Sequence, residues 1–200
     1  MPDKTEFEKM LSGEHFNAAA SEFAPIQGEA ARKMQAYNSM PADDIGALVG
    51  AMRDICHPDS VFAIVKPPFF FEFGRHIHFG EQVFVNMNCT FLDSAPIRIG
   101  DFTAIGPNCQ LITPTHELEF EKRLPLSKTG PQRRDPVTFA KPIHIGKHCW
   151  LGAGVIVMPG ITIGDGAVIG AGSVVTKDIP ANVIAIGSPC RVVQKIPESD

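Results

Sequence analysis

A six-residue repeat in residues 143–193 constrains the fold of this chain more than any other feature of its sequence. An aliphatic residue recurs at every sixth position, usually followed by glycine, at Ile145, Leu151, Val157, Ile163, Ile169 and Val175. Four positions further on, the repeat holds residues small or apolar enough to point inward, namely Cys149, Val155, Ile161, Ala167, Ser173 and Ile179. Ordinary hairpins would instead show period-two alternation and irregular turn spacing. The repeat therefore predicts a parallel β-helix, in which about three hexapeptides close each triangular coil.

The repeat begins earlier in the chain and is interrupted before it resumes. Related segments occur at residues 77–80, 85–86, 91–92, 99–100 and 105–106, with a two-residue slip at 93–96. After Leu111 the pattern stops, and it resumes at Ile143. Residues 113–141 are therefore expected to leave the solenoid as an excursion loop, and a long excursion from a regular scaffold often carries function.

The first 60 residues lack the repeat and are predicted to form a small helical cap. Helical spacing is found at 30–37 and 43–55, with Asp43 or Asp44 as the N-cap of the second of these helices. Paired prolines in residues 66–74 forbid helix, and the aromatic run beside them suits a strand that enters the first coil. The expected organisation is a helical cap at 1–60, a β-helix domain at 61–193 and a C-terminal tail at 194–200.

The composition argues against two classes of partner. A net charge of −4 and a pI near 6.0 do not suit a general nucleic-acid surface, because neutralising phosphates requires clustered Lys and Arg. No stretch approaches the ~18 apolar residues of a membrane span. The five cysteines show no paired spacing, and Cys89, Cys109 and Cys149 occupy small inward positions of the repeat. We therefore expect reduced structural thiols, no nucleic-acid or membrane partner, and a cytoplasmic protein.

Four segments together carry a family resemblance. They are GEHF in the expected cap, PPFFFEFGRHIHFG, NMNCTFLDSAPIRIGDFTAIGPNCQLITPTH, and the stretch that runs from KPIHIG to CRVV. In combination, and over nearly the whole chain, they resemble the maltose and galactoside O-acetyltransferases and their nodulation-type relatives. The resemblance implies a mainly β fold, a left-handed parallel β-helix, assembled as a homotrimer with active sites between neighbouring subunits. It also implies transfer of an acetyl group from acetyl-CoA to a sugar hydroxyl.

His116 matches the catalytic histidine of that family. Acetyl transfer to a hydroxyl requires a base for the alcohol proton, donors for the tetrahedral oxyanion, and a cleft that aligns the thioester. Imidazole can serve as such a base at neutral pH. A lone histidine is more often structural, but position and motif favour His116 as a general base in direct attack, with no metal and no covalent acetyl-enzyme.

The resemblance also assigns residues to the two substrates. The acceptor is expected to contact Asn17, Glu72, Asn86 and Asp93. Asn86 stands where the repeat normally has glycine, so it has a second interpretation as a residue that tolerates a left-handed turn. Acetyl-CoA is expected to contact Trp150, Gly152, Ala153, Ala171, Thr176, Lys177 and Arg191, with an amide of the turn at 152–153 as oxyanion donor. Lys177 could equally form a surface pair with Asp178.

Two departures from the family pattern affect the details. Many members carry a glutamate shortly before the repeat restarts, whereas this chain has Val137, Thr138 and Phe139, so support for the imidazole must come from elsewhere. Residues 122–134 are also unusually basic, with five cations. This segment is either a solvated surface loop or a lid that folds back over an anionic group of the acceptor or of CoA.

Two other functions remain open at this level. A γ-type carbonic anhydrase is also a left-handed β-helix trimer, and it would need three histidines on zinc between subunits. The candidate ligands, which do not match that spacing, are His76, His78, His116, His144 and His148. A non-catalytic scaffold or sugar-binding protein would be favoured if the His116 position were vacant. Outward apolar residues such as Phe102, Trp150 and Ile156 support a trimer, because a short solenoid would otherwise expose them.

Overall fold

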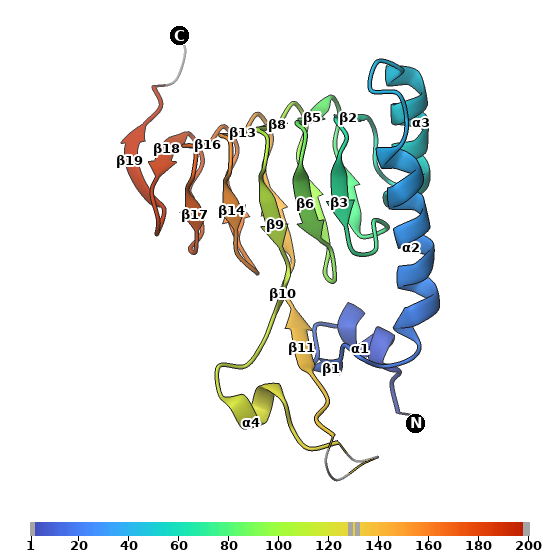
Figure 1. The fold of residues 1–200 in the computed structure, drawn as a ribbon. Helices are drawn as coiled ribbons and strands as arrows, with labels where there is room; N and C mark the ends of the chain where they lie inside the picture. Colours follow the sequence, from blue (N-terminus) through green and yellow to red (C-terminus); the bar gives the residue numbers. More distant parts are fainter. Residues whose placement is uncertain (1–2, 128–129, 131–132, 198–200) are drawn as a thin grey trace.

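The computed structural model describes residues 3–127, 130 and 133–197. Its main body is a parallel β-helix that carries helices at its N-terminal end and an excursion at one edge (Figure 1). The part of the chain that is described contains no helix both long and apolar enough to cross a bilayer. The predicted fold class, a mainly β chain with a small N-terminal helical cap, is confirmed.

Three parallel sheets form the sides of the β-helix. The first face consists of β2 (Ala63–Val65), β5 (Val83–Val85), β8 (Ala104–Ile105), β13 (Trp150–Leu151), β16 (Val168–Ile169) and β18 (Val183–Ile186). The second face consists of β3 (Phe69–Phe71), β6 (Cys89–Leu92), β9 (Gln110–Ile112), β14 (Ile156–Val157) and β17 (Val174–Val175). The third face consists of β4 (Ile77–Phe79), β7 (Ile97–Ile99), β12 (Ile143–Ile145) and β15 (Thr162–Ile163). The expected tail begins inside a strand, since β19 (Arg191–Lys195) pairs antiparallel with β18.

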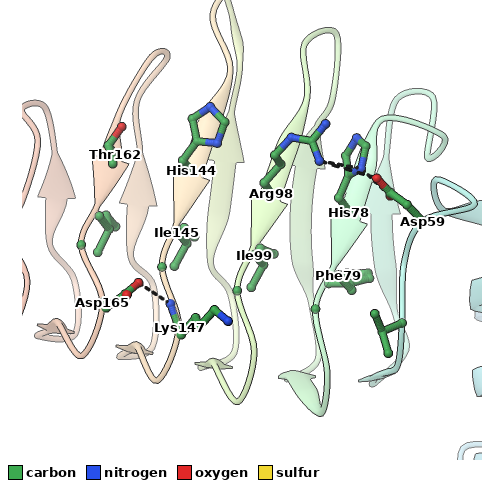
Figure 2. A pocket seen from close by; sticks show the side chains of 16 residues that line it. Asp59, His78, Phe79, Arg98, Ile99, His144, Ile145, Lys147, Thr162 and Asp165 are labelled. Carbon is green, nitrogen blue, oxygen red and sulfur yellow. Dashed lines mark hydrogen bonds and ion pairs between the residues drawn. The ribbon is translucent and has the colours of Figure 1, made fainter.

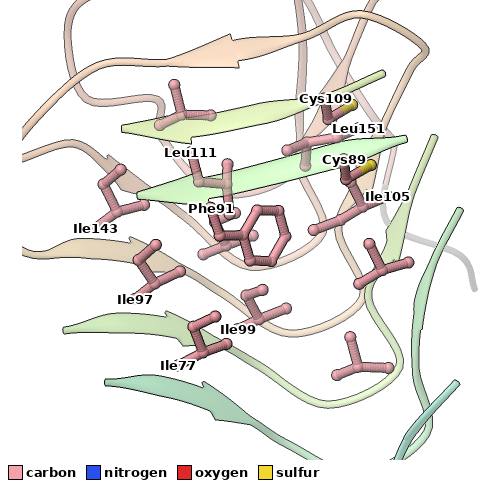
Figure 3. Packing of buried hydrophobic residues seen from close by; sticks show 14 of the residues in the cluster. Ile77, Cys89, Phe91, Ile97, Ile99, Ile105, Cys109, Leu111, Ile143 and Leu151 are labelled. Carbon is pink, nitrogen blue, oxygen red and sulfur yellow. The ribbon is translucent and has the colours of Figure 1, made fainter. Parts of the chain in front are cut away.

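The core of the β-helix is a set of stacked aliphatic ladders. Ile77, Ile97 and Ile143 occupy the same inward position on neighbouring strands and are fully buried (Figure 3). The coils approach so closely that a Cβ on Gly100 would lie 2.6 Å from the backbone carbon of Gly146. The glycine position of the repeat is therefore required by backbone contact between neighbouring coils.

The cap covers the first coil. It contains α1 (Glu6–Leu11), α2 (Phe23–Asn38) and α3 (Ile45–Ile55). Asp44 is the N-cap of α3, as the sequence predicts, and its carboxylate accepts the amide of Ala47 at 3.0 Å. The hydroxyl of Tyr37 donates to the carbonyl of Val65 and ties α2 to β2. Figure 1 shows α2 and α3 standing beside the first coil, at the end of the solenoid opposite β19.

The excursion and the cap share a small antiparallel sheet. In order, its strands are β1 (Phe16–Asn17), β11 (Val137–Ala140) and β10 (Pro114–Thr115), and the short helix α4 (Phe120–Arg123) lies between β10 and β11 in the chain. The excursion leaves and rejoins the solenoid at one point, where the amide of Lys141 donates to the carbonyl of Thr113 at 3.0 Å. Residues 16–17 of the cap thus also pair with the excursion.

Candidate active site

His116 follows β10 and is held by the strand opposite it. Its Nδ1 lies 2.9 Å from the carbonyl oxygen of Val137 and 3.4 Å from the hydroxyl of Thr138. Because a carbonyl can only accept, Nδ1 carries the proton, and the lone pair of the imidazole is on Nε2. The carbonyl of Val137 therefore supports the imidazole in place of the missing glutamate. It fixes the tautomer in which Nε2 can accept a proton.

His116 lines a pocket of about 420 Å³ between the cap, the edge of the second face and the excursion. A separate pocket of about 440 Å³, which we name the third-face groove, lies on the third face and does not include His116. Apolar side chains provide most of the wall of the His116 pocket, which we name the acceptor pocket, and they include four phenylalanines. Its polar residues come from four parts of the chain. They are Gln27 of α2, Glu72 after β3, Ser94 after β6, and His116 and Thr138 of the excursion sheet.

Glu72 is the carboxylate of the acceptor pocket. Its Oε2 accepts the Ser94 hydroxyl at 2.6 Å, and its Oε1 lies 3.4 Å from the amide nitrogen of Gln27. Burial raises the pKa of Glu72, against the lowering effect of the Ser94 hydrogen bond, and the nearby charge of Asp93 raises it further. Ser94 and Gln27 have no repeat or motif signal, which is why sequence analysis missed them.

Asp93 lies behind this pocket rather than in its wall. Its side chain is fully buried, and its two oxygens accept backbone amides of Glu72, Phe73 and His76 at 3.1, 2.8 and 3.2 Å. A carboxylate enclosed in this way organises the turn that carries Glu72. Its predicted contact with the acceptor stays a prediction.

Asn17 does not line this pocket in the single chain. Its side-chain oxygen accepts the amide of Ala19 at 2.9 Å, as in an Asx turn, while the next residue, Ala18, lines the pocket. With alanine there, the cap adds no charge to this wall. The contact of Asn17 with an acceptor stays a prediction.

Asn86, the remaining acceptor candidate, lies on another edge of the β-helix. The acetyl-CoA candidates Gly152, Ala153 and Ala171 lie on the same edge. Asn86 follows β5, and its amide donates to Ile105, just as Gly106 donates to Leu151 and Gly152 to Ile169 in the following coils. Asn86, Gly106 and Gly152 are thus stacked where the first face turns into the second. We name this line the glycine edge, and it also carries the exposed residues Ala153 and Ala171. The amide of Gly152 is already bonded, so of the predicted pair only the Ala153 amide remains as an oxyanion donor.

The other CoA candidates are exposed at the C-terminal end. Trp150 points outward from β13 with 59% of its surface exposed. Thr176 and Lys177 follow β17, and the neighbouring Asp178 accepts the amide of Thr162 at 2.8 Å. The guanidinium of Arg191 donates to the carbonyl of Cys190 at 2.7 Å. These residues do not converge with His116 in one cavity of a single chain.

The basic segment pairs largely with its own excursion. Arg134 contacts Glu121 at 2.8 Å and lies over the ring of Phe120, and Lys122 contacts Glu119 at 3.0 Å. Arg133 contacts Asp135 at 3.5 Å, and Arg123 donates to the carbonyl of Glu117 at 3.2 Å. Lys128 lies outside the described residues. Among the described cations of this segment, Lys122, Arg133 and Arg134 thus each have a carboxylate partner within the excursion.

The histidines do not form a carbonic-anhydrase site within one chain. The two around β4 are both buried and have different partners: His76 Nδ1 donates to the carbonyl of Asp93 at 2.7 Å, whereas His78 lies beside Asp59. Burial lowers the pKa of His76, although hydrogen bonding at Asp93 opposes this. Among the described residues, His116 belongs to no cluster of three possible metal ligands.

Comparison with known proteins places the chain in a family. A model described as the hexapeptide repeat of succinyl-transferase matches residues 142–177. Nodulation protein L of Rhizobium meliloti is 40% identical over 94% of this chain and 98% of its own length. A maltose O-acetyltransferase from Clostridium difficile has a TM-score of 0.87 and 38% identity, covering 98% of this chain and all of its own. A galactoside acetyltransferase in complex with coenzyme A has a TM-score of 0.83 and 32% identity, covering 98% and 92%.

These similarities extend over the cap, the coils and the excursion that holds His116, and they confirm the left-handed β-helix class. The chain therefore belongs to the hexapeptide-repeat acetyltransferases that include the maltose and galactoside O-acetyltransferases and nodulation protein L.

Proposed function

We propose that this protein transfers the acetyl group of acetyl-CoA to a hydroxyl of a sugar or sugar-like acceptor, with His116 as the general base. The observation that carries the proposal is the His116–Val137 contact of 2.9 Å at the wall of the acceptor pocket. It leaves the lone pair of Nε2 available to a bound hydroxyl. Family membership supports the donor, since a galactoside acetyltransferase of this fold is solved with coenzyme A.

The reaction proceeds by direct attack. The acceptor hydroxyl oxygen bonds to the thioester carbonyl carbon while Nε2 takes its proton, and the carbonyl oxygen becomes an oxyanion. The Ala153 amide is the proposed donor to that oxyanion. When the carbon–sulfur bond breaks, the imidazolium returns its proton to the CoA thiolate. Glu72, Ser94 and Gln27 would bind other hydroxyls of the acceptor, since together they offer both hydrogen-bond donors and acceptors.

The active form is proposed to be a homotrimer. His116 and the acceptor pocket lie at the excursion, whereas Ala153 and Asn86 lie on the glycine edge. A complete site therefore requires one chain's pocket to meet another chain's glycine edge, as cyclic association of identical chains allows. Five free, buried cysteines fit the reducing cytoplasm proposed for this enzyme.

The proposal is tested by replacing the base. His116→Ala is expected to lower kcat by roughly 10²–10⁴-fold, measured as thiol release from acetyl-CoA with a panel of sugars. CoA binding, measured by calorimetry, should stay near the native value. His144→Gln is the matched control, because His144 is exposed on the third face and does not line the acceptor pocket. Native activity in His116→Ala would reject the assignment, and no transfer to any sugar by the native enzyme would reject the acceptor class.

A further inference from the structure

A second group of side chains with possible chemistry lies where the cap meets the first coil. It consists of His57 and Asp59, in the loop between α3 and β2, and His78 of β4; we name it the His57 cluster. Its three possible ligand atoms all lie within 4.8 Å of one another. None of the three residues lines the acceptor pocket. Figure 2 shows Asp59 and His78 side by side at the end of the third-face groove, with Arg98 beside them.

The geometry of the cluster is that of a converging ligand set. Oδ1 of Asp59 lies 2.7 Å from Nδ1 of His57 and 2.6 Å from Nδ1 of His78. The two imidazole rings are stacked, with centroids 4.0 Å apart and an interplanar angle of 25°. The loop is fixed by backbone hydrogen bonds from His57 to Ile77 and from Val61 to Phe79, at 2.9 and 2.8 Å. The backbone that carries the three ligands is therefore fixed by the fold, while the side chains of His57 and Asp59 are 41% and 53% exposed.

No placement of protons on the two Nδ1 atoms satisfies all of their hydrogen-bonding neighbours. Nδ1 of His57 faces the Asp59 carboxylate and also the backbone N–H of Asp59, at 3.3 Å. Nδ1 of His78 faces the same carboxylate and also the Arg98 guanidinium, at 3.1 Å. A protonated Nδ1 suits the carboxylate but opposes the N–H donor, and an unprotonated Nδ1 does the reverse. Each nitrogen thus has one neighbour that its protonation state cannot satisfy.

We propose that His57, Asp59 and His78 bind a divalent transition-metal ion of the zinc type, through both Nδ1 atoms and the carboxylate. Two imidazoles and one carboxylate form a common zinc ligand set, which leaves a fourth position for water. A tetrahedral ion about 2.1 Å from each ligand separates the ligand atoms by roughly 3.4 Å, so each of the two contacts between Asp59 and a histidine must lengthen by less than ~1 Å. Asp59 can supply this movement, because 53% of its side chain is exposed.

The nearest charge that opposes such an ion is Arg98. Its guanidinium lies 3.7 Å from Oδ2 of Asp59, and 49% of the side chain is exposed, so it can swing into solvent. A second cation of the same groove, Lys147, is paired with Asp101 at 2.8 Å. Bound metal would join the loop after α3 to β4 and so fasten the cap to the first coil. The proposed role is structural, and acetyl transfer does not depend on it.

The test uses the full, tag-free chain after treatment with a chelator. Titration with Co²⁺ should give saturable one-to-one visible absorption, and Zn²⁺ should displace Co²⁺ and raise Tm. Asp59→Asn and His57→Gln replace exposed ligands without emptying the core, and each should weaken Zn²⁺ binding by at least about tenfold. His144→Gln, on the same face but outside the cluster, should bind like the native chain.

Arg98→Ala gives a result that a purely hydrogen-bonded cluster does not predict. Removing the competing cation should tighten Zn²⁺ binding several-fold, by the Coulombic effect of a unit charge a few ångströms away. Absence of saturable binding in the native chain would overturn the proposal. So would binding that survives unchanged in both Asp59→Asn and His57→Gln, since the ion would then be held elsewhere.

Discussion

At the scale of single residues, Glu72, which we propose to bind the acceptor, also lowers the stability of the fold when it ionises. The raised pKa means that the folded chain holds the Glu72 proton more tightly than the unfolded chain does. This contribution to the unfolding free energy is complete below the unfolded pKa, near 4.5, and is lost as pH rises through the higher folded pKa. Ionisation of Glu72 thus destabilises the fold as the pH rises through the folded pKa.

We expect Glu72→Gln to be more thermostable than the native chain at pH 8, because the amide removes a buried charge. The difference in Tm should shrink toward pH 4, where Glu72 is protonated in both states. Parallel melting curves of the two proteins across this range measure it. An equal Tm difference at all pH values would show that titration of Glu72 is not the cause.

The same substitution should harm acceptor binding. A hydrogen bond to a charged group contributes about 1.5–3 kcal/mol, so Glu72→Gln is expected to raise the acceptor KM by roughly 10–100-fold. The KM for acetyl-CoA should change little, because Glu72 lies in the acceptor pocket. Glu81→Gln, at an exposed carboxylate outside that pocket, provides the control. A rise in the KM for acetyl-CoA alone would contradict the assignment of Glu72 to the acceptor.

Residue identities could be predicted only where a motif marks them. The motif selected His116 and Glu72, and the structure places both in one pocket wall. The partner of His116 is a main-chain carbonyl, which every residue possesses, so no side-chain pattern could point to Val137. The resemblance assigned Asp93 to the acceptor, and the sequence could not show that its carboxylate is buried and accepts the backbone amides of a turn.

At the scale of elements, the tight contact between coils depends on the glycine position of the repeat. Gly100→Ala should strongly destabilise the protein, by more than ~2 kcal/mol, because its Cβ would meet the Gly146 backbone at 2.6 Å. Gly50→Ala in α3 has nothing within 4 Å of the new Cβ and should stabilise by ~0.5–1 kcal/mol. Urea midpoints at one protein concentration compare them. A Gly100→Ala midpoint equal to the native one would mean that the coils can separate at little cost.

Strands that follow the six-residue repeat could be predicted from the sequence. Strands that pair with segments far away in the chain could not. The six-residue spacing located the strands of the β-helix from β4 onward, and the stop after Leu111 located the excursion. The sheet of β1, β11 and β10 was not predicted for two reasons. It joins residues 16–17 to residues 137–138, which are far apart in the sequence, and β1 is only two residues long. Short strands of this kind have no periodicity of their own, and tertiary pairing decides them.

At the scale of the whole molecule, the separation of the two half-sites makes assembly a testable requirement. Outward apolar residues support it, since Phe102 and Trp150 are 47% and 59% exposed in one chain. Light scattering should give three times the 21.7 kDa of the single chain. A stable monomer that still transfers acetyl groups would contradict the inter-subunit site.

Mixing two defective chains tests the site directly. His116→Ala lacks the base, and Ala153→Trp should block the glycine edge, so each alone is expected to be inactive. In randomly mixed trimers, about a quarter of the sites would combine an intact pocket with an intact edge from the neighbour. Activity near that fraction after co-refolding supports the shared site. Mixtures that stay inactive, although they contain mixed trimers by mass spectrometry, would place the whole site within one chain.

The point where the excursion meets the solenoid has an evolutionary consequence. Because Thr113 and Lys141 are hydrogen-bonded to each other, the chain returns to the place it left, and β9 and β12 keep their register whatever lies between them. Insertions or deletions in residues 114–140 need not disturb the stacking of coils on either side. The excursion can therefore be exchanged as a cassette, so that acceptor preference diversifies by recombination or loop grafting while the donor half of the enzyme is inherited unchanged.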